Sequence, residues 1–120
     1  MTFGLSKNER LNSQKLIKEL FDKGSSFFLY PFKVLVLPSE AAEVNQVLFS
    51  VSKRKFKKAV DRNLVKRRMR EAYRLNKHLL SESGSNKKLI AFIYVSGDIL
   101  TFQTIETKLV KVLETISEDQ

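Results

Sequence analysis

Apolar residues near the N-terminus recur at the three- and four-residue spacing of a helix and then give way to a continuous apolar run. Residues 14–23 are expected to form an amphipathic helix whose apolar stripe comprises Leu16, Ile17, Leu20 and Phe21. Ser13 is placed to cap the start of this helix, and Gly24 stands where a glycine often follows a helix end. The aromatic and β-branched stretch 27–37 predicts a strand, in which Pro31 indicates an edge position or a bulge. The first third of the chain therefore predicts one helix followed by one strand.

The rest of the chain alternates between short apolar runs and longer amphipathic segments. Residues 47–52 predict a second strand, and residues 60–80 predict a long helix. After a polar linker at 81–88, the uninterrupted apolar run 89–95 is typical of a strand buried on both faces. A final amphipathic helix is marked by Ile105, Leu109, Val112, Leu113 and Ile116. The order α-β-β-α-β-α predicts a single α+β domain over residues 1–120, a two-layer sandwich of helices on a small sheet.

The net charge of the chain is concentrated in one segment. Residues 53–74 contain eleven Lys or Arg and two acidic residues, which gives +9, the net charge of the whole chain. Like charges held this close together repel one another and lower stability. A polyanionic partner removes that repulsion and releases its condensed counterions when it binds. The charge pattern therefore indicates a nucleic acid partner.

The long predicted helix separates this charge from its apolar residues. At the helical turn of about 100° per residue, an arc of roughly 140° holds Arg62, Asn63, Lys66, Arg67, Arg70 and Arg74. The opposite side is predicted to be the packing side, with Leu64, Val65, Met69, Ala72, Leu75 and Leu79. Arg68 points toward that apolar side, where it is expected to snorkel or to pair with an acid. Because guanidinium groups bind phosphate through two parallel hydrogen bonds, the polar arc favours RNA over a merely solvated surface.

The sequence disfavours several other classes of protein. It has no Cys, which excludes disulfides and thiolate metal sites. The only histidine, His78, has no Ser or Cys nucleophile pattern beside it, no acidic cluster has metal-ligand spacing, and no glycine-rich phosphate loop occurs. We therefore expect no catalytic site in this chain.

Membrane association is also disfavoured. The longest apolar run, 89–95, is too short to span a bilayer, and the N-terminus lacks the apolar stretch of a signal peptide. Binding to an anionic membrane surface is an alternative, but the charged segment has no clean face of large apolar residues to insert. A cytoplasmic protein is expected.

Two neighbouring motifs carry a resemblance to a known family. Phe49-Ser-Val-Ser-Lys-Arg is followed by Ala59-Val-Asp-Arg-Asn-Leu-Val-Lys-Arg-Arg-Met-Arg-Glu-Ala-Tyr-Arg. This stretch resembles the protein subunit of bacterial ribonuclease P, whose strand ends in Ser-Val-Ser-Lys and whose helix opens with Ala-Val-x-Arg-Asn-Arg-x-x-Lys-Arg-x-x-Arg-Glu. The resemblance covers roughly residues 5–116.

This chain departs from the family pattern at a few positions. Leu64 stands where the family has the second Arg of its Arg-Asn-Arg core, and the loop at 53–58 is one residue longer than the common glycine-containing version. Ile17 and Leu35 replace aromatic residues of the family. The contacts made at these places are therefore expected to differ.

The resemblance implies a fold and a function. The fold would be a small mixed sheet with the long basic helix in a left-handed β-α-β crossover, ribosomal protein S5 domain 2-like. The RNA subunit would be the catalyst, cutting precursor tRNA with Mg²⁺ held mainly by the RNA and releasing the 5′ leader. The chain would be the non-catalytic protein subunit of this endoribonuclease and would lower its magnesium requirement. Its partners would be ribonuclease P RNA and precursor tRNA, with no small-molecule substrate and no membrane.

The resemblance also assigns roles to individual residues. RNA would be bound by Lys53, Arg54, Lys55, Lys58, Arg62, Asn63, Lys66, Arg67, Arg70 and Arg74. A cleft beside the sheet would hold the single-stranded leader through Ile17, Phe21, Phe32, Lys33 and Leu35. The alternative is a stand-alone or ribosomal RNA-binding protein that uses the same basic helix. A DNA-binding regulator is disfavoured because the expected sheet does not resemble a helix-turn-helix.

Overall fold

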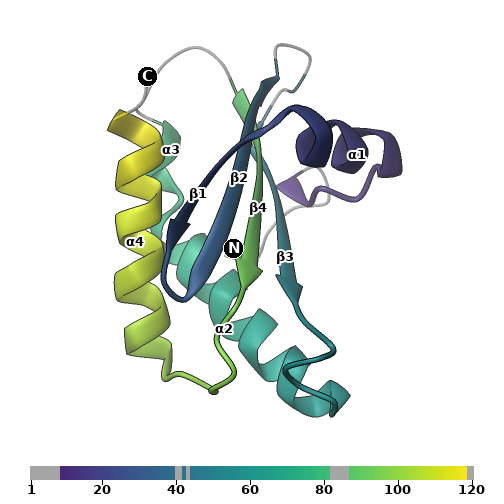
Figure 1. The fold of residues 1–120 in the computed structure, drawn as a ribbon. Coiled ribbons are helices and arrows are strands. Elements are labelled where there is room, and N and C mark those ends of the chain that lie inside the picture. Colours follow the sequence, from purple (N-terminus) through teal and green to yellow (C-terminus); the bar gives the residue numbers. More distant parts are fainter. Residues whose placement is uncertain (1–8, 40–41, 43, 82–86, 119–120) are drawn as a thin grey trace.

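The computed structural model of the chain describes residues 9–39, 42, 44–81 and 87–118. In chain order its elements are α1 (Gln14–Lys23), β1 (Ser25–Leu29), β2 (Phe32–Ser39), β3 (Gln46–Val51), α2 (Ala59–Asn76), α3 (His78–Ser81), β4 (Lys87–Tyr94) and α4 (Phe102–Glu118). Figure 1 shows α2 and α4 along one side of the sheet and α1 on the other. The predicted α+β sandwich is confirmed.

The sheet is mixed and has β4 in its interior. Its strand order is β1-β2-β4-β3, with β1, β2 and β4 paired antiparallel and β3 paired parallel to β4. Because β3 and β4 are adjacent and parallel, the intervening α2 forms a β-α-β crossover between them. Nearly every side chain of β4 is buried, as the apolar run predicted.

The two faces of the sheet carry separate apolar clusters. Side chains alternate along β2, so Phe32 and Val34 join the large core that also holds residues of α2 and α4. Leu35 points to the other face, where it packs with Leu20 of α1 and Ala91 of β4. The larger core fixes the position of α2, and the smaller cluster fixes that of α1.

The strand predicted over 27–37 is wrong in one respect, because it is a hairpin rather than a single strand. β1 ends at Leu29, the chain turns at Tyr30 and Pro31, and β2 runs back antiparallel with Phe28 opposite Lys33. Proline has no N–H to donate to a neighbouring strand, which favours ending the ladder there. The structure therefore has three strands before the long helix, where the sequence predicted two.

The predicted start and end of α1 are confirmed. The Ser13 hydroxyl accepts a hydrogen bond from the backbone N–H of Leu16 at 3.3 Å, and the Gly24 N–H donates to the Leu20 carbonyl at 2.9 Å. Gly24 has an extended backbone, so its role is one of space rather than of left-handed conformation. A Cβ atom there would lie 2.4 Å from the Leu20 carbonyl oxygen, which no side chain can accommodate without a backbone shift.

Candidate RNA-binding surfaces

The packing of α2 decides which of its residues are open to a partner. Val65, Met69, Ala72 and Tyr73 are buried against the sheet and α4. The Tyr73 ring lies edge-on to Phe49 with ring centres 6.0 Å apart, which places it in the core. The side of the helix opposite this packed stripe therefore faces outward.

The prediction of the packing side of α2 is wrong for one residue, which is exposed, and only partly right for another, which is half-buried. Leu75 is 47% exposed, and Leu64 is only half-buried. The helical wheel placed them among core residues because it gives angles but not the direction in which a helix packs. Since the Tyr73 ring belongs to the core, the buried stripe is rotated away from Leu75.

Four of the predicted RNA-binding residues share one hollow on α2. It has a volume of about 430 Å³ and is lined by Val60, Asn63, Leu64, Lys66, Arg67 and Arg70. Asn63, Arg67 and Arg70 are exposed, and Lys66 is half-buried. We call this surface the α2 hollow. It presents three cationic groups and an amide, which suits phosphate oxygens and ribose or base edges.

Arg62, Arg68 and Arg74 lie outside the α2 hollow and make contacts within the chain. The Arg62 guanidinium donates to the carbonyls of Phe56 and Lys57 at 2.7 and 3.0 Å. Arg68 donates to the Leu100 carbonyl at 2.6 Å, so of the two predicted alternatives, snorkelling or pairing with an acid, the structure shows no acid partner among the described residues but a backbone carbonyl. Arg74 forms an ion pair with Glu71. These contacts give Arg62 and Arg68 a part in holding neighbouring loops.

The basic loop before α2 is anchored by one aromatic side chain. Phe56 is buried, and its ring lies 6.1 Å from that of Tyr94, measured between ring centres. Its N–H donates to the Ser52 carbonyl at 3.2 Å, and its own carbonyl accepts from Arg62. The predicted RNA-binding side chains of this loop are all exposed: Lys53, Arg54, Lys55 and Lys58.

The residues predicted to form the leader cleft are distributed over both faces of the sheet. Phe21 on α1 and Lys33 on β2 are exposed, while Ile17 is half-buried and Leu35 is buried in the cluster beneath α1. Phe32 is the wrong residue for this surface, because it is fully buried on the opposite face, with its ring edge-on to that of Phe92. Adjacent residues of a strand point to opposite faces, so Phe32 and Lys33 cannot line the same surface.

The aromatic residue that does share a face with Lys33 is Phe28. The two are directly paired between β1 and β2, and Lys33 is paired in turn with Ile93, which pairs with Ser50. Directly paired residues point to the same side, so these four form a row across the α1 side of the sheet. Phe28 is 64% exposed, and we call this row the Phe28 row. The alternation of strand residues would have revealed it once the hairpin was known.

Burial shifts the pKa of three side chains outside these surfaces. It raises the pKa of Tyr73 and Tyr94, and it lowers the pKa of Lys88, to which the neighbouring charge of Lys87 also contributes. The Tyr94 hydroxyl donates to the Asp98 carbonyl at 2.5 Å and accepts from the Leu100 N–H at 3.2 Å. Tyr94 therefore holds the loop between β4 and α4.

Comparison with known proteins identifies the family. The model of the family described as Ribonuclease P matches residues 5–117. The chain belongs to the ribonuclease P protein family. This agrees with the resemblance carried by the strand and helix motif.

Relatives of the ribonuclease P family match over nearly the whole chain. A ribonuclease P protein component from Porphyromonas gingivalis is 45% identical over 117 residues, covering 93% of this chain and 85% of that protein. The solved RNase P protein from Thermotoga maritima is 25% identical with a TM-score of 0.74, covering 89% of this chain and 96% of the other. A mutant RNase P protein from Staphylococcus aureus is 26% identical with a TM-score of 0.78, covering 92% and 89%. The fold is therefore that of ribonuclease P proteins.

The resemblance to ribonuclease P proteins also implies magnesium. Within residues 9–39, 42, 44–81 and 87–118, no three His, Cys, Asp or Glu side chains lie together so that they could hold a metal ion. The described residues therefore do not fit a metal held by protein side chains alone. None of the helices in these ranges is long and apolar enough to cross a membrane.

Proposed function

We propose that this chain is the RNA-binding, non-catalytic protein component of a cytoplasmic ribonuclease P that removes the 5′ leader from precursor tRNA. Membership of the family supports the assembly with ribonuclease P RNA. The observation that carries the RNA-binding role is the α2 hollow, where Asn63, Lys66, Arg67 and Arg70 face outward together. Catalysis is assigned to the RNA subunit.

The α2 hollow is proposed to bind ribonuclease P RNA. Its side chains are long and flexible, and their charge is uncompensated within the hollow, so bringing phosphates to them relieves repulsion and releases counterions. Val60 and Leu64 give the hollow an apolar wall, and Val60 is 76% exposed. Such a wall is complementary to sugar and base edges rather than to phosphate.

The Phe28 row is proposed to bind the leader. An exposed phenyl ring can stack on any base, because every base has a π-face, so contact there does not depend on sequence. Lys33 lies directly opposite Phe28 in the neighbouring strand and can attract the backbone of the same nucleotide. Phe21, which is 50% exposed on α1, is a second candidate for stacking.

Magnesium is assigned to the RNA subunit in this proposal. When bound, Mg²⁺ would supply a nucleophile and stabilise charge at the scissile phosphate. The chain would act by neutralising crowded phosphates where two RNAs meet, because charge supplied by Arg and Lys replaces charge otherwise supplied by ions. We therefore expect the chain to lower the magnesium concentration that the RNA requires.

A cleavage assay tests this function. Precursor tRNA is incubated at low magnesium with ribonuclease P RNA from the same organism, with the chain, or with both. The proposal expects a mature 5′ end only when both are present. Tight RNA binding without any stimulation of cleavage would instead favour a stand-alone RNA-binding protein.

A further inference from the structure

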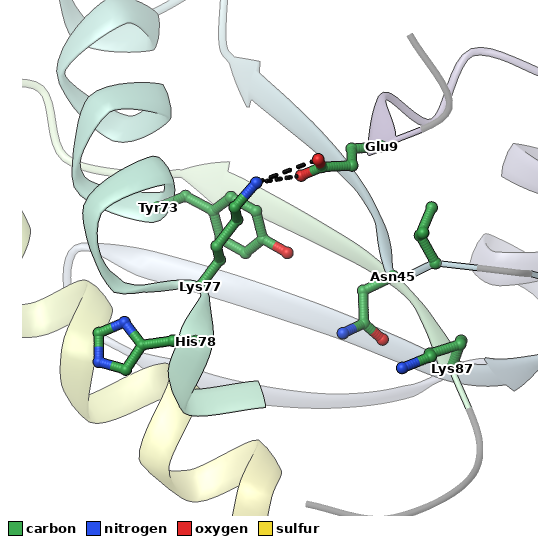
Figure 2. A pocket seen from close by; sticks show the side chains of 7 residues that line it. Glu9, Asn45, Tyr73, Lys77, His78 and Lys87 are labelled. Carbon is green, nitrogen blue, oxygen red and sulfur yellow. Dashed lines mark hydrogen bonds and ion pairs between the residues drawn. The ribbon is translucent and has the colours of Figure 1, made fainter. Parts of the chain in front are cut away.

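A second polar pocket lies apart from the α2 hollow and shares none of its residues. It has a volume of about 310 Å³ and forms where the end of α2, the start of β4 and the segments before β3 and α1 meet (Figure 2). Its polar and charged lining residues are Glu9, Asn45, Tyr73, Lys77, His78 and Lys87. We call it the Tyr73 pocket. It takes no part in the proposed function.

Hydrogen bonds within the chain leave this pocket rich in donors. Lys77 donates from Nζ to both carboxylate oxygens of Glu9, at 3.0 and 2.9 Å, so the one acidic group among the described lining residues is already paired. The Oδ1 atom of Asn45 accepts the backbone N–H of Lys88 at 2.9 Å. That bond fixes the amide orientation and leaves the NH₂ group of Asn45 directed toward the pocket, as Figure 2 shows.

Tyr73 contributes a hydroxyl at the base of the pocket. The residue is 2% exposed, its ring packs against those of Phe49 and Phe92, and its hydroxyl points into the pocket (Figure 2). Burial, and then the charge of Glu9, raise the pKa of Tyr73, so the phenol keeps its proton. A protonated hydroxyl that faces the pocket can donate a hydrogen bond to an acceptor oxygen of a ligand there.

The charged residues of the pocket indicate what kind of ligand it would bind. Lys87 adds an ammonium group opposite Lys77, and His78 also lines the pocket, with its imidazole turned away from Asn45 and Lys87 (Figure 2). A ligand that meets a phenol, an amide NH₂ and an ammonium group must offer several acceptor oxygens and negative charge. A phosphodiester of RNA places two anionic oxygens and two ester oxygens tetrahedrally around phosphorus, whereas a carboxylate has two oxygens in one plane.

The position of the pocket favours a phosphate that belongs to RNA. Lys77 follows Arg67 by ten residues, which is about 15 Å along a helix. On the helical wheel Lys77 falls inside the same arc as Lys66 and Arg70. A strand whose backbone lies on the α2 hollow can therefore continue toward the Tyr73 pocket.

We propose that the Tyr73 pocket binds a phosphate group of an RNA strand that also contacts α2, through the Tyr73 hydroxyl, the Asn45 amide and the Lys87 ammonium group. The RNA source of the phosphate rests on the proposed function, whereas the anion chemistry of the pocket does not. The first test is a titration with inorganic phosphate at constant pH and ionic strength. His78 lines the pocket and is the only histidine of the chain, so its imidazole NMR signals can be assigned without ambiguity.

The proposal expects a saturable shift of the His78 signals with phosphate. Tyr73→Phe keeps the ring and removes only the hydroxyl, and it should weaken phosphate binding severalfold, as should Lys87→Gln. Lys111→Gln removes the same charge from an exposed position on α4 and should leave the titration unchanged. A shift that fails to saturate, or that is equal in all variants, overturns the site.

The second test separates RNA phosphate from free phosphate. Binding of ribonuclease P RNA is measured against salt concentration for Lys87→Gln, Lys111→Gln and Arg67→Ala. Lys87→Gln should lower the slope of log K against log salt by about one, and Lys111→Gln should not. If only Arg67→Ala lowers the slope, the pocket does not take an RNA phosphate, although the proposed function stands. If neither Arg67→Ala nor Lys87→Gln lowers it, the RNA-binding role of α2 fails as well.

Discussion

Phe28 and Phe32 lie four residues apart on the two strands of one hairpin, and the same substitution should have opposite consequences at the two positions. Phe32 is fully buried, with ring centres of Phe92 and Tyr94 at 6.0 and 6.3 Å. Removing such a ring costs about 3–5 kcal/mol of folding stability. Phe28 is 64% exposed, so about a third of its surface is buried. Since full burial of Phe is worth about 1.5–3 kcal/mol, Phe28→Ala should cost only about 0.5–1 kcal/mol.

For RNA binding we expect the opposite order: substitution of Phe28 should have the larger effect and substitution of Phe32 the smaller. Loss of one stacked base costs about 1–3 kcal/mol, which corresponds to an affinity about 5 to 150 times weaker. Phe28→Ala should therefore weaken binding of precursor tRNA, in the presence of ribonuclease P RNA, and leave binding of mature tRNA unchanged. Phe32→Leu is the matched control, because it perturbs the core while the chain still folds.

Urea unfolding and binding measurements on the same preparations decide between the two roles. The reasoning is refuted if Phe28→Ala weakens precursor and mature tRNA binding equally. It is also refuted if Phe28→Ala lowers stability as much as substitution of Phe32 does. Either result would mean that the exposed ring of Phe28 serves the fold and not the leader.

Three further predictions concern α2 and the helix ends. Arg67→Ala should lower the salt slope of RNA binding by about one, measured by filter binding, and an unchanged slope would exclude a phosphate contact. Arg62→Ala should destabilise the fold by about 1 kcal/mol in urea unfolding, because the carbonyls of Phe56 and Lys57 lose a charged donor. Gly24→Ala should cost about 1–3 kcal/mol in thermal unfolding, since its Cβ would meet the Leu20 carbonyl; equal melting of both proteins would refute the close approach.

The sequence predicted the elements that depend on local pattern. The run 89–95 was recognised as a strand buried on both faces, and the apolar stripe of α4 and both ends of α1 are where the spacing placed them. These features follow from residues that are neighbours along the chain, so periodicity alone indicates them. The concentration of positive charge in residues 53–74 can likewise be recognised from the sequence without the structure.

Features that depend on chain reversal or packing direction were not predicted correctly. Taking 27–37 as one strand hid the hairpin, and without its register Phe28 could not be placed beside Lys33. Phe32 was assigned to the leader surface through the family resemblance, although alternation with Lys33 argues against it. The Tyr73 pocket was not predictable, because Glu9, Asn45 and Lys87 come together only through the fold.

The magnesium dependence of cleavage tests the central claim most directly. The concentration of Mg²⁺ that gives half-maximal removal of the 5′ leader is measured for ribonuclease P RNA alone, with the chain, and with a chain carrying Lys66→Gln, Arg67→Gln and Arg70→Gln. The account predicts that the chain lowers this concentration severalfold and that the triple variant, although folded, largely fails to do so. If the triple variant lowers it as well as the unaltered chain does, the α2 hollow is not where the RNA subunit binds.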